Sequence, residues 1–99
     1  MNCSRTDLEG ETRLRIGGAL DALTVREISP VIDGIVDAKR PRVVVELEEL
    51  TLIDSSGVGA IVSLYKRVKA DGGQVVVTGA REQPLAVLKL LKLDRVFGL

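Results

Sequence analysis

The 99-residue chain contains no histidine and no tryptophan, and only one cysteine, one tyrosine and one phenylalanine. Without histidine, the usual general base, the Ser-His catalytic pair and most zinc sites are excluded. Two aromatic rings provide no platform on which nucleic-acid bases could stack. The 14 basic and 14 acidic residues balance, so no net charge attracts a polyanion. We therefore expect neither an enzyme nor a nucleic-acid-binding protein, and no metal or cofactor.

The sequence also lacks the features of secreted and membrane proteins. The lone Cys3 cannot form an intramolecular disulfide, no signal peptide is recognisable, and no uninterrupted apolar stretch has membrane-spanning length. These features predict a cytoplasmic protein that does not insert into a membrane. A hydrophobic fraction of 45% predicts a single domain over residues 1–99 with an aliphatic core.

Alternating and continuous apolar runs predict four to five strands. They are expected at residues 1–11 (at best a short edge strand), 12–16, 42–47 leading on through 50–53, 74–78 and 95–99. Gly17-Gly18 should end the second of these. The valine run at 43–45 is typical of a central strand that is covered on both faces.

Apolar residues at helical spacing predict three helices. They are expected at about residues 29–38 with a weaker first turn from about 25, over the apolar positions 58–68 with a stop at 71–73, and at about 82–92. Thr24 and Glu27 have the spacing of a capping box at the start of the first helix, although Pro30 makes its first turn weak. In the last helix, the residues expected to face inward are Leu85, Leu88, Leu91 and Leu93. The alternating order predicts an α/β domain with a mixed, mostly parallel β-sheet of four to five strands and three to four helices.

The junction between residues 50–53 and the second helix carries the only concentrated polar chemistry, Asp54-Ser55-Ser56-Gly57. Three explanations are open: the polar side chains cap the helix, form a catalytic centre, or include a serine that another protein modifies. Gly57 and Gly59 each cost about 0.5–1 kcal/mol relative to alanine in a helix. Their presence indicates that bulk is removed from around the hydroxyls, so that a partner could approach.

The position of this junction also favours a working site. It follows the carboxyl end of a predicted parallel strand, where open α/β sheets bind their ligands. A helix N-terminus tolerates an added phosphate because free N–H groups and the helix dipole favour an anion. No Walker A motif, dinucleotide fingerprint or Gly-x-Ser-x-Gly elbow is present. Catalysis at this junction is therefore disfavoured.

The segment LIDSSGVGAIVSLYKRVKADGGQVVVTG, residues 52–79, resembles the STAS domain and specifically the bacterial anti-sigma factor antagonists. Residues 54–59 match the family hexapeptide Asp-Ser-Ser/Thr-Gly-Leu/Val-Gly at every position. A second family element, Gly-Glu-Leu-Asp-x-x-Thr, is similar to residues 18–24, with Ala19 in place of the glutamate. The likeness extends over residues 13–99.

This resemblance implies a binding protein that is switched by phosphorylation. In such proteins the first serine after the aspartate, here Ser55 with Ser56 as second choice, is phosphorylated by an anti-sigma factor that is also a GHKL-type serine kinase. The unmodified form binds that kinase and so releases a sigma factor, and a serine phosphatase resets the cycle. Asp21 and Asp54 are expected beside the serine.

A partner-binding surface is expected around the serine and along the second helix. Leu64 is either partly exposed on this surface or a core residue on a wide apolar face of the helix. The predicted members of the surface are Asp21, Thr24, Asp54, Ser56, Gly57, Gly59, Ala60, Ser63, Leu64 and Arg67. The alternative is a constitutive STAS subunit without a phosphoswitch, as in a stressosome, a secretion regulator or a phospholipid-transport ATPase. The sequence also leaves a homodimer open.

Overall fold

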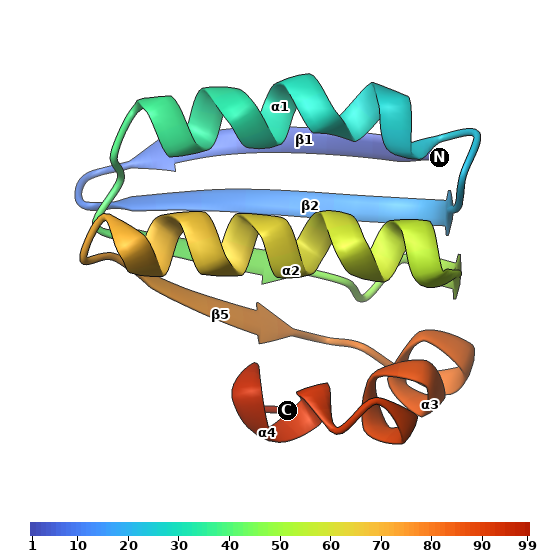
Figure 1. Ribbon diagram of the computed structural model, residues 1–99. Coiled ribbons are helices and arrows are strands. Elements are labelled where there is room, and N and C mark those ends of the chain that lie inside the picture. Colours follow the sequence, from blue (N-terminus) through green and yellow to red (C-terminus); the bar gives the residue numbers. More distant parts are fainter.

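Five strands and four helices make up the computed structural model, which describes residues 1–99 (Figure 1). In chain order they are β1 (Asn2–Leu8), β2 (Glu11–Leu20), α1 (Val25–Asp37), β3 (Arg42–Glu46), β4 (Leu50–Ile53), α2 (Ser55–Ala70), β5 (Gln74–Thr78), α3 (Glu82–Leu90) and α4 (Leu93–Val96). β1 is antiparallel to β2, whereas the pairs β2–β3, β2–β4 and β3–β5 are parallel. The predicted α/β domain with a mixed, mostly parallel sheet is thus confirmed.

Strand β2 is the centre of the sheet, because it pairs with β1 on one edge and with both β3 and β4 on the other. β3 pairs with residues 12–15 of β2, and β4 pairs with residues 18–20. The expectation that the strand ends at Gly17-Gly18 was wrong. The strand continues through them to Leu20, with a shift of register between Gly18 and Ala19 and with Gly18 at a φ of 80°. The bend brings β4, and hence the start of α2, beside the end of β2.

Helices α1 and α2 lie side by side over one face of the sheet (Figure 1). They enclose an aliphatic core to which β2, β3 and β5 contribute alternate residues, among them Leu14, Val45 and Val77. The expected burial of β3 on both faces is confirmed, although helices cover only one face and Val44 points away from the core beneath them. Val44 is nevertheless 5% exposed, because it lies in register between Arg13 and Val76 on the neighbouring strands. A long arginine side chain can cover an apolar neighbour in this way.

Helix α1 begins at Val25 and runs without interruption through Pro30, which is exposed. Thr24 is at the N-cap position, but its hydroxyl makes no capping bond, so the predicted capping box was wrong. The hydroxyl is occupied within the preceding turn, where it donates to the carbonyl of Ala19 at 2.8 Å and accepts from the N–H of Asp21 at 2.9 Å.

The C-terminal residues form a helix where a strand was expected. Helix α3 ends at Leu90, and Lys92 then adopts a left-handed conformation with φ of 60°, which redirects the chain into α4. Leu91 is therefore 51% exposed, contrary to prediction, while Leu88 is buried as predicted. Residues 95–99 do not form a strand because Phe97 turns into the core and contacts the ring of Tyr65 edge-on, with ring centroids 5.5 Å apart.

Candidate functional site

The N-terminus of α2 is capped by Asp54 and not by either serine. One oxygen of the Asp54 carboxylate, Oδ1, accepts from the backbone N–H of Gly57 at 3.0 Å. Ser55 and Ser56 occupy the first two positions of the helix, and neither hydroxyl makes a hydrogen bond within the chain. The side chain of Ser55 is exposed and that of Ser56 is half-buried. Capping thus accounts for the aspartate and leaves the Ser55 hydroxyl free.

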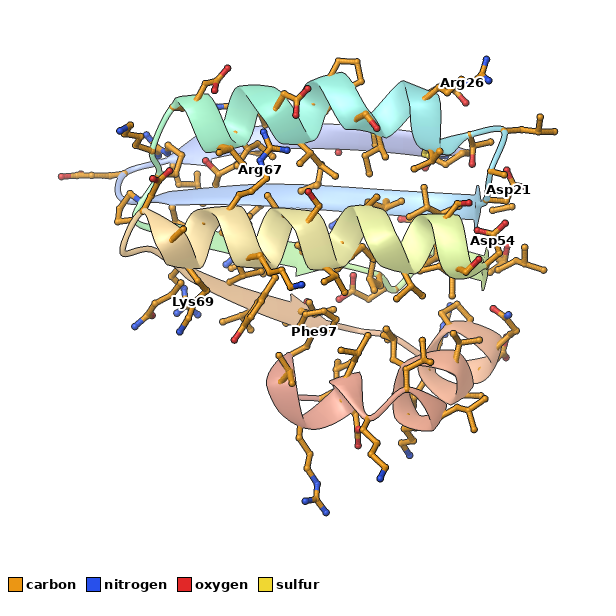
Figure 2. The ribbon with its side chains drawn as sticks, in the orientation of Figure 1. Asp21, Arg26, Asp54, Arg67, Lys69 and Phe97 are labelled. Carbon is orange, nitrogen blue, oxygen red and sulfur yellow. The ribbon has the colours of Figure 1, made fainter.

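The second oxygen of Asp54 holds the turn between β2 and α1. Asp54 Oδ2 accepts from the backbone N–H of Ala22 at 3.1 Å, so one carboxylate joins two segments that are distant in sequence. Asp21 stabilises the same turn, because its Oδ1 accepts from the N–H groups of Leu23 and Thr24, each at 3.0 Å. Figure 2 shows Asp21 and Asp54 as neighbours at the end of the sheet where α2 begins.

These hydrogen bonds keep Asp21 charged. The backbone N–H of Thr24 is the main cause of a pKa of Asp21 below its ordinary value of 3.8, and the N–H of Leu23 acts in the same direction. Both carboxylates that the sequence predicted to accompany Ser55 therefore lie at this end of the molecule, and together they provide a negatively charged border to an uncharged hydroxyl.

The two glycines of the first turn of α2 have different structural roles. A Cβ at Gly57 would lie 2.5 Å from the carbonyl oxygen of Leu20 and 2.8 Å from a side-chain carbon of Ile53. Gly57 is buried, so its missing side chain permits close packing of α2 against β2, and the prediction that it faces a partner was wrong. A Cβ at Gly59 would meet no atom within 4 Å. Only Gly59 thus leaves space open on the surface.

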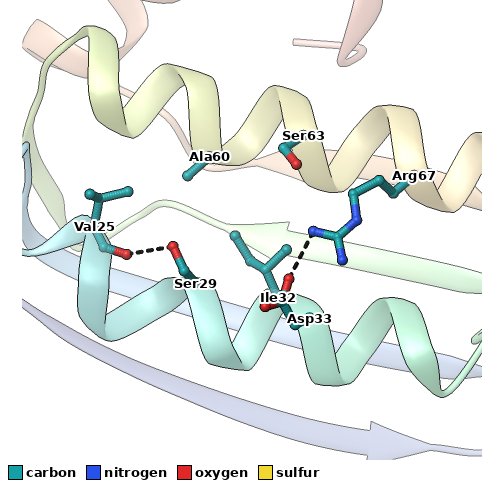
Figure 3. Close-up of a pocket in the computed structure, with 7 residues that line it drawn as sticks. All are labelled: Val25, Ser29, Ile32, Asp33, Ala60, Ser63 and Arg67. Carbon is teal, nitrogen blue, oxygen red and sulfur yellow. Dashed lines mark hydrogen bonds and ion pairs between the residues drawn. The ribbon is translucent and has the colours of Figure 1, made fainter.

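A groove lies between α1 and α2 and contains three of the residues predicted to contact a partner (Figure 3). Its volume is about 150 Å³. The lining residues are Val25, Ser29, Ile32 and Asp33 from α1, and Ala60, Ser63 and Arg67 from α2. Arg67 reaches across the groove to Asp33, with a nitrogen–oxygen distance of 2.9 Å. Helix α2 thus carries Ser55 at its first position and contributes Ala60, Ser63 and Arg67 to this groove.

Leu64 does not belong to that surface. Its side chain is 1% exposed and is part of the core, because it lies on the inward side of α2 with Ile61 and Val68. Partial exposure of Leu64 was therefore wrong, and the alternative, a core position on a wide apolar face of the helix, is confirmed. The predicted residues that retain some exposure are Asp21, Thr24, Asp54, Ser56, Gly59, Ala60, Ser63 and Arg67.

One residue that sequence reasoning missed is Leu23, which is 84% exposed on the turn held by Asp21 and Asp54. A signal for it was present in the Asp21-x-x-Thr24 spacing. An aspartate that accepts from the N–H groups two and three residues later forms a tight turn, and such a turn exposes its central residues.

The comparison with known families identifies the chain. The model of the STAS domain matches residues 5–99. The chain belongs to the STAS domain family.

Solved structures show that this STAS domain has relatives with different roles. It is similar to an anti-sigma factor antagonist from Mycobacterium paratuberculosis, with a TM-score of 0.84 and 21% identity over 97% of this chain and 81% of the other. The Bacillus cell fate determinant SpoIIAA in its phosphorylated form has a TM-score of 0.78 and 20% identity over 95% and 86% of the two chains. A sulfate transporter family protein from Wolinella succinogenes has a TM-score of 0.74 and 14% identity over 89% and 71%.

These likenesses establish the fold of the STAS domain and leave its role to be argued from the site. The sequence of this chain is only 14–21% identical to those of these three proteins, which have different roles. None of the four helices of this domain is both long and apolar enough to cross a membrane. The role of this chain is therefore argued from the residues around Ser55.

Proposed function

We propose that this STAS domain is an anti-sigma factor antagonist controlled by phosphorylation of Ser55. Unphosphorylated, it binds a GHKL-type protein that is both anti-sigma factor and serine kinase, and thereby frees a sigma factor in the cytoplasm. The observation that carries the proposal is the division of roles at the start of α2, where Asp54 makes the cap and the exposed Ser55 hydroxyl makes no bond. Similarity to anti-sigma factor antagonists supports it, among them SpoIIAA, which was solved both unphosphorylated and in a phosphorylated form.

The proposed reaction is catalysed by the partner and not by this chain. The kinase transfers the γ-phosphoryl group of ATP to the Ser55 oxygen, the hydroxyl proton passes to a base of the kinase, and ADP leaves. The product carries about 1.5–2 additional negative charges at neutral pH. At the first position of α2 this charge is offset in part by the unpaired N–H groups and the helix dipole. The fold should therefore remain, while the partner meets a bulky anion bordered by Asp21 and Asp54.

The test is phosphorylation in vitro, with Ser55→Ala and Ser56→Ala as matched variants. Each protein is incubated with ATP and, one at a time, the GHKL kinases encoded in the same genome, and phosphate is located by mass spectrometry. We expect one kinase to modify the wild type and Ser56→Ala but not Ser55→Ala. Binding of that kinase, measured by calorimetry, should be lost after modification and restored by a serine phosphatase. Phosphate on Ser56 alone would refute the assignment of Ser55.

A constitutive subunit is the second candidate, because the same fold is found in a sulfate transporter family protein. Under that alternative, the domain forms a stable complex but no kinase adds phosphate to Ser55. Size-exclusion chromatography of the purified domain tests at the same time whether it forms a homodimer.

The local nature of the switch has its own test in Ser55→Asp. We expect this variant to lose kinase binding while its melting temperature stays close to that of the wild type. A large fall in melting temperature together with loss of binding would show that the charge acts by unfolding the domain.

A further inference from the structure

Leu23 is the most exposed of the large apolar side chains, at 84%, and Leu90 follows at 81%. A single exposed leucine requires no special explanation in a soluble protein. Leu23 differs from Leu90 in what holds it and in what lies next to it. These two differences indicate a binding role for Leu23.

The backbone that carries Leu23 is fixed by a compact network of hydrogen bonds. The N–H of Leu23 itself donates to the Asp21 carboxylate at 3.0 Å, and the N–H of Val25 donates to the carbonyl of Asp21 at 2.9 Å. Thr24 closes the turn from the other side, because its hydroxyl bonds to the N–H of Asp21 and to the carbonyl of Ala19. A side chain on a pre-ordered backbone loses less conformational entropy on binding than one on a flexible loop.

The turn is also attached to the start of α2. Ala22, which precedes Leu23, donates its N–H to Asp54 Oδ2, and Asp54 precedes Ser55. Leu23 thus directly follows the donor residue of this hydrogen bond, and Ser55 directly follows the acceptor residue. Because this bond joins the turn to the start of α2, we expect a partner whose active site encloses the Ser55 hydroxyl to contact the turn that carries Leu23.

We propose that Leu23 is the apolar anchor of this interface and enters a hydrophobic pocket on the kinase, beside the site of phosphoryl transfer. The inference rests on the proposed phosphorylation of Ser55. A protein pocket fits better than an anionic lipid surface, because the charged Asp21 lies in the same turn and would be repelled by lipid phosphates. The role of Leu23 is to hold the kinase on the substrate, so it should affect binding and not the chemical step.

The test compares Leu23→Ala with Leu90→Ala, which removes the same atoms from an almost equally exposed leucine on α3. Each variant is assayed with the kinase that modifies Ser55, for KM and kcat of phosphorylation and for Kd by calorimetry. We expect Leu23→Ala to raise KM and Kd about 10- to 100-fold with kcat unchanged, as loss of one buried leucine implies. Leu90→Ala should behave as the wild type. Leu23→Met, which keeps an apolar side chain of similar size, should restore most of the affinity.

The outcomes separate this inference from the proposed function. If Leu23→Ala is bound and phosphorylated as well as the wild type, or if Leu90→Ala loses as much affinity, the anchor is refuted while the Ser55 switch stands. If a kinase binds the wild type without modifying it, the switch fails, and the Kd comparison still decides whether Leu23 anchors the complex. If no kinase binds the wild type, both proposals fall.

Discussion

Replacement of Asp54 by alanine should lower the free energy of unfolding by about 2 kcal/mol, because this carboxylate makes two structural hydrogen bonds. Loss of the N-cap bond to Gly57 costs about 1 kcal/mol. Loss of the bond to Ala22, which attaches the β2–α1 turn to α2, costs about another 1 kcal/mol. For a domain of this size, 1 kcal/mol shifts the melting temperature by about 4–8 °C, so a decrease of about 8–16 °C is expected.

A graded set of variants makes the prediction specific. Asp54→Asn has one acceptor oxygen where the aspartate has two, so it can keep the cap but must give up the bond to Ala22, and it should lose about 1 kcal/mol. Ser55→Ala and Ser56→Ala should each change stability by less than about 0.5 kcal/mol, because neither hydroxyl is bonded within the chain. Urea denaturation followed by circular dichroism measures the whole set.

The reasoning would be refuted by the opposite order. If Ser55→Ala were as destabilising as Asp54→Ala, the serine would be a cap, and the claim that its hydroxyl is free for modification would fail. If Asp54→Asn matched the wild type, the bond to Ala22 would contribute nothing, and the turn that carries Leu23 would not depend on α2.

Three further predictions concern the rest of the site and the fold. Gly57→Ala should destabilise the domain by about 1–3 kcal/mol, because the new Cβ collides with Leu20. Gly59→Ala should stabilise it by about 0.5–1 kcal/mol, because its Cβ meets no atom. Urea unfolding of the two variants tests the difference. Leu64→Ala should cost about 2–5 kcal/mol in the same assay, and a change below about 0.5 kcal/mol would mean that Leu64 is on the surface after all. The pKa of Asp21 is lowered in the folded state, so its contribution to stability is present above the unfolded pKa and is lost as the pH falls through the folded value. With no histidine in the chain, the melting temperature should be constant between about pH 5 and 8 and should fall in more acidic buffer. The fall should be less steep for Asp21→Asn. A melting temperature that changes with pH in the neutral range would contradict this reasoning.

Much of the fold was predictable because periodicity reports burial directly. The alternation of Leu14 and Ile16 placed β2, and the helical spacing from Val58 to Val68 placed α2. Periodicity does not show which part of the molecule covers a buried side chain. The run of valines in β3 indicated burial on both faces, but only one face is covered by helices, and Val44 on the other is covered by its strand neighbours.

Features that depend on distant residues were not predictable from local patterns. Residues 47–49 separate β3 from β4. Backbone hydrogen bonds to other strands hold this segment, such as that from the N–H of Leu47 to the carbonyl of Thr78 at 2.8 Å. Beyond it, the side-chain amide of Gln83 pairs with both the N–H and the carbonyl of Ile53, each at 2.9 Å, and so attaches α3 to the outer edge of β4. A glutamine in a helix carries no local sign of such a partner.

The site was predictable in its residue types but not in the division of their roles. Gly57 and Gly59 are two residues apart in one helix, yet one is required for packing and the other is open, because successive positions of a helix face different directions. The sequence alone equally allowed Asp54 or either serine to be the cap. Only the geometry of Asp54 Oδ1 and the N–H of Gly57 decides it.

The position of Ser55 immediately after the cap has a physical consequence for a phosphoswitch. A serine at the N-cap uses its oxygen to accept from the helix, so a phosphate on that oxygen would disturb the bond that starts the helix. The Ser55 oxygen, at the first helical position, is unbonded, and a phosphate on it would lie close to unpaired N–H groups that favour an anion. The proposed phosphorylation would therefore change the charge at this surface while Asp54 keeps both α2 and the Leu23 turn in place. A protein that must be switched off and reused benefits from this arrangement, because removal of the phosphate returns an intact surface without refolding.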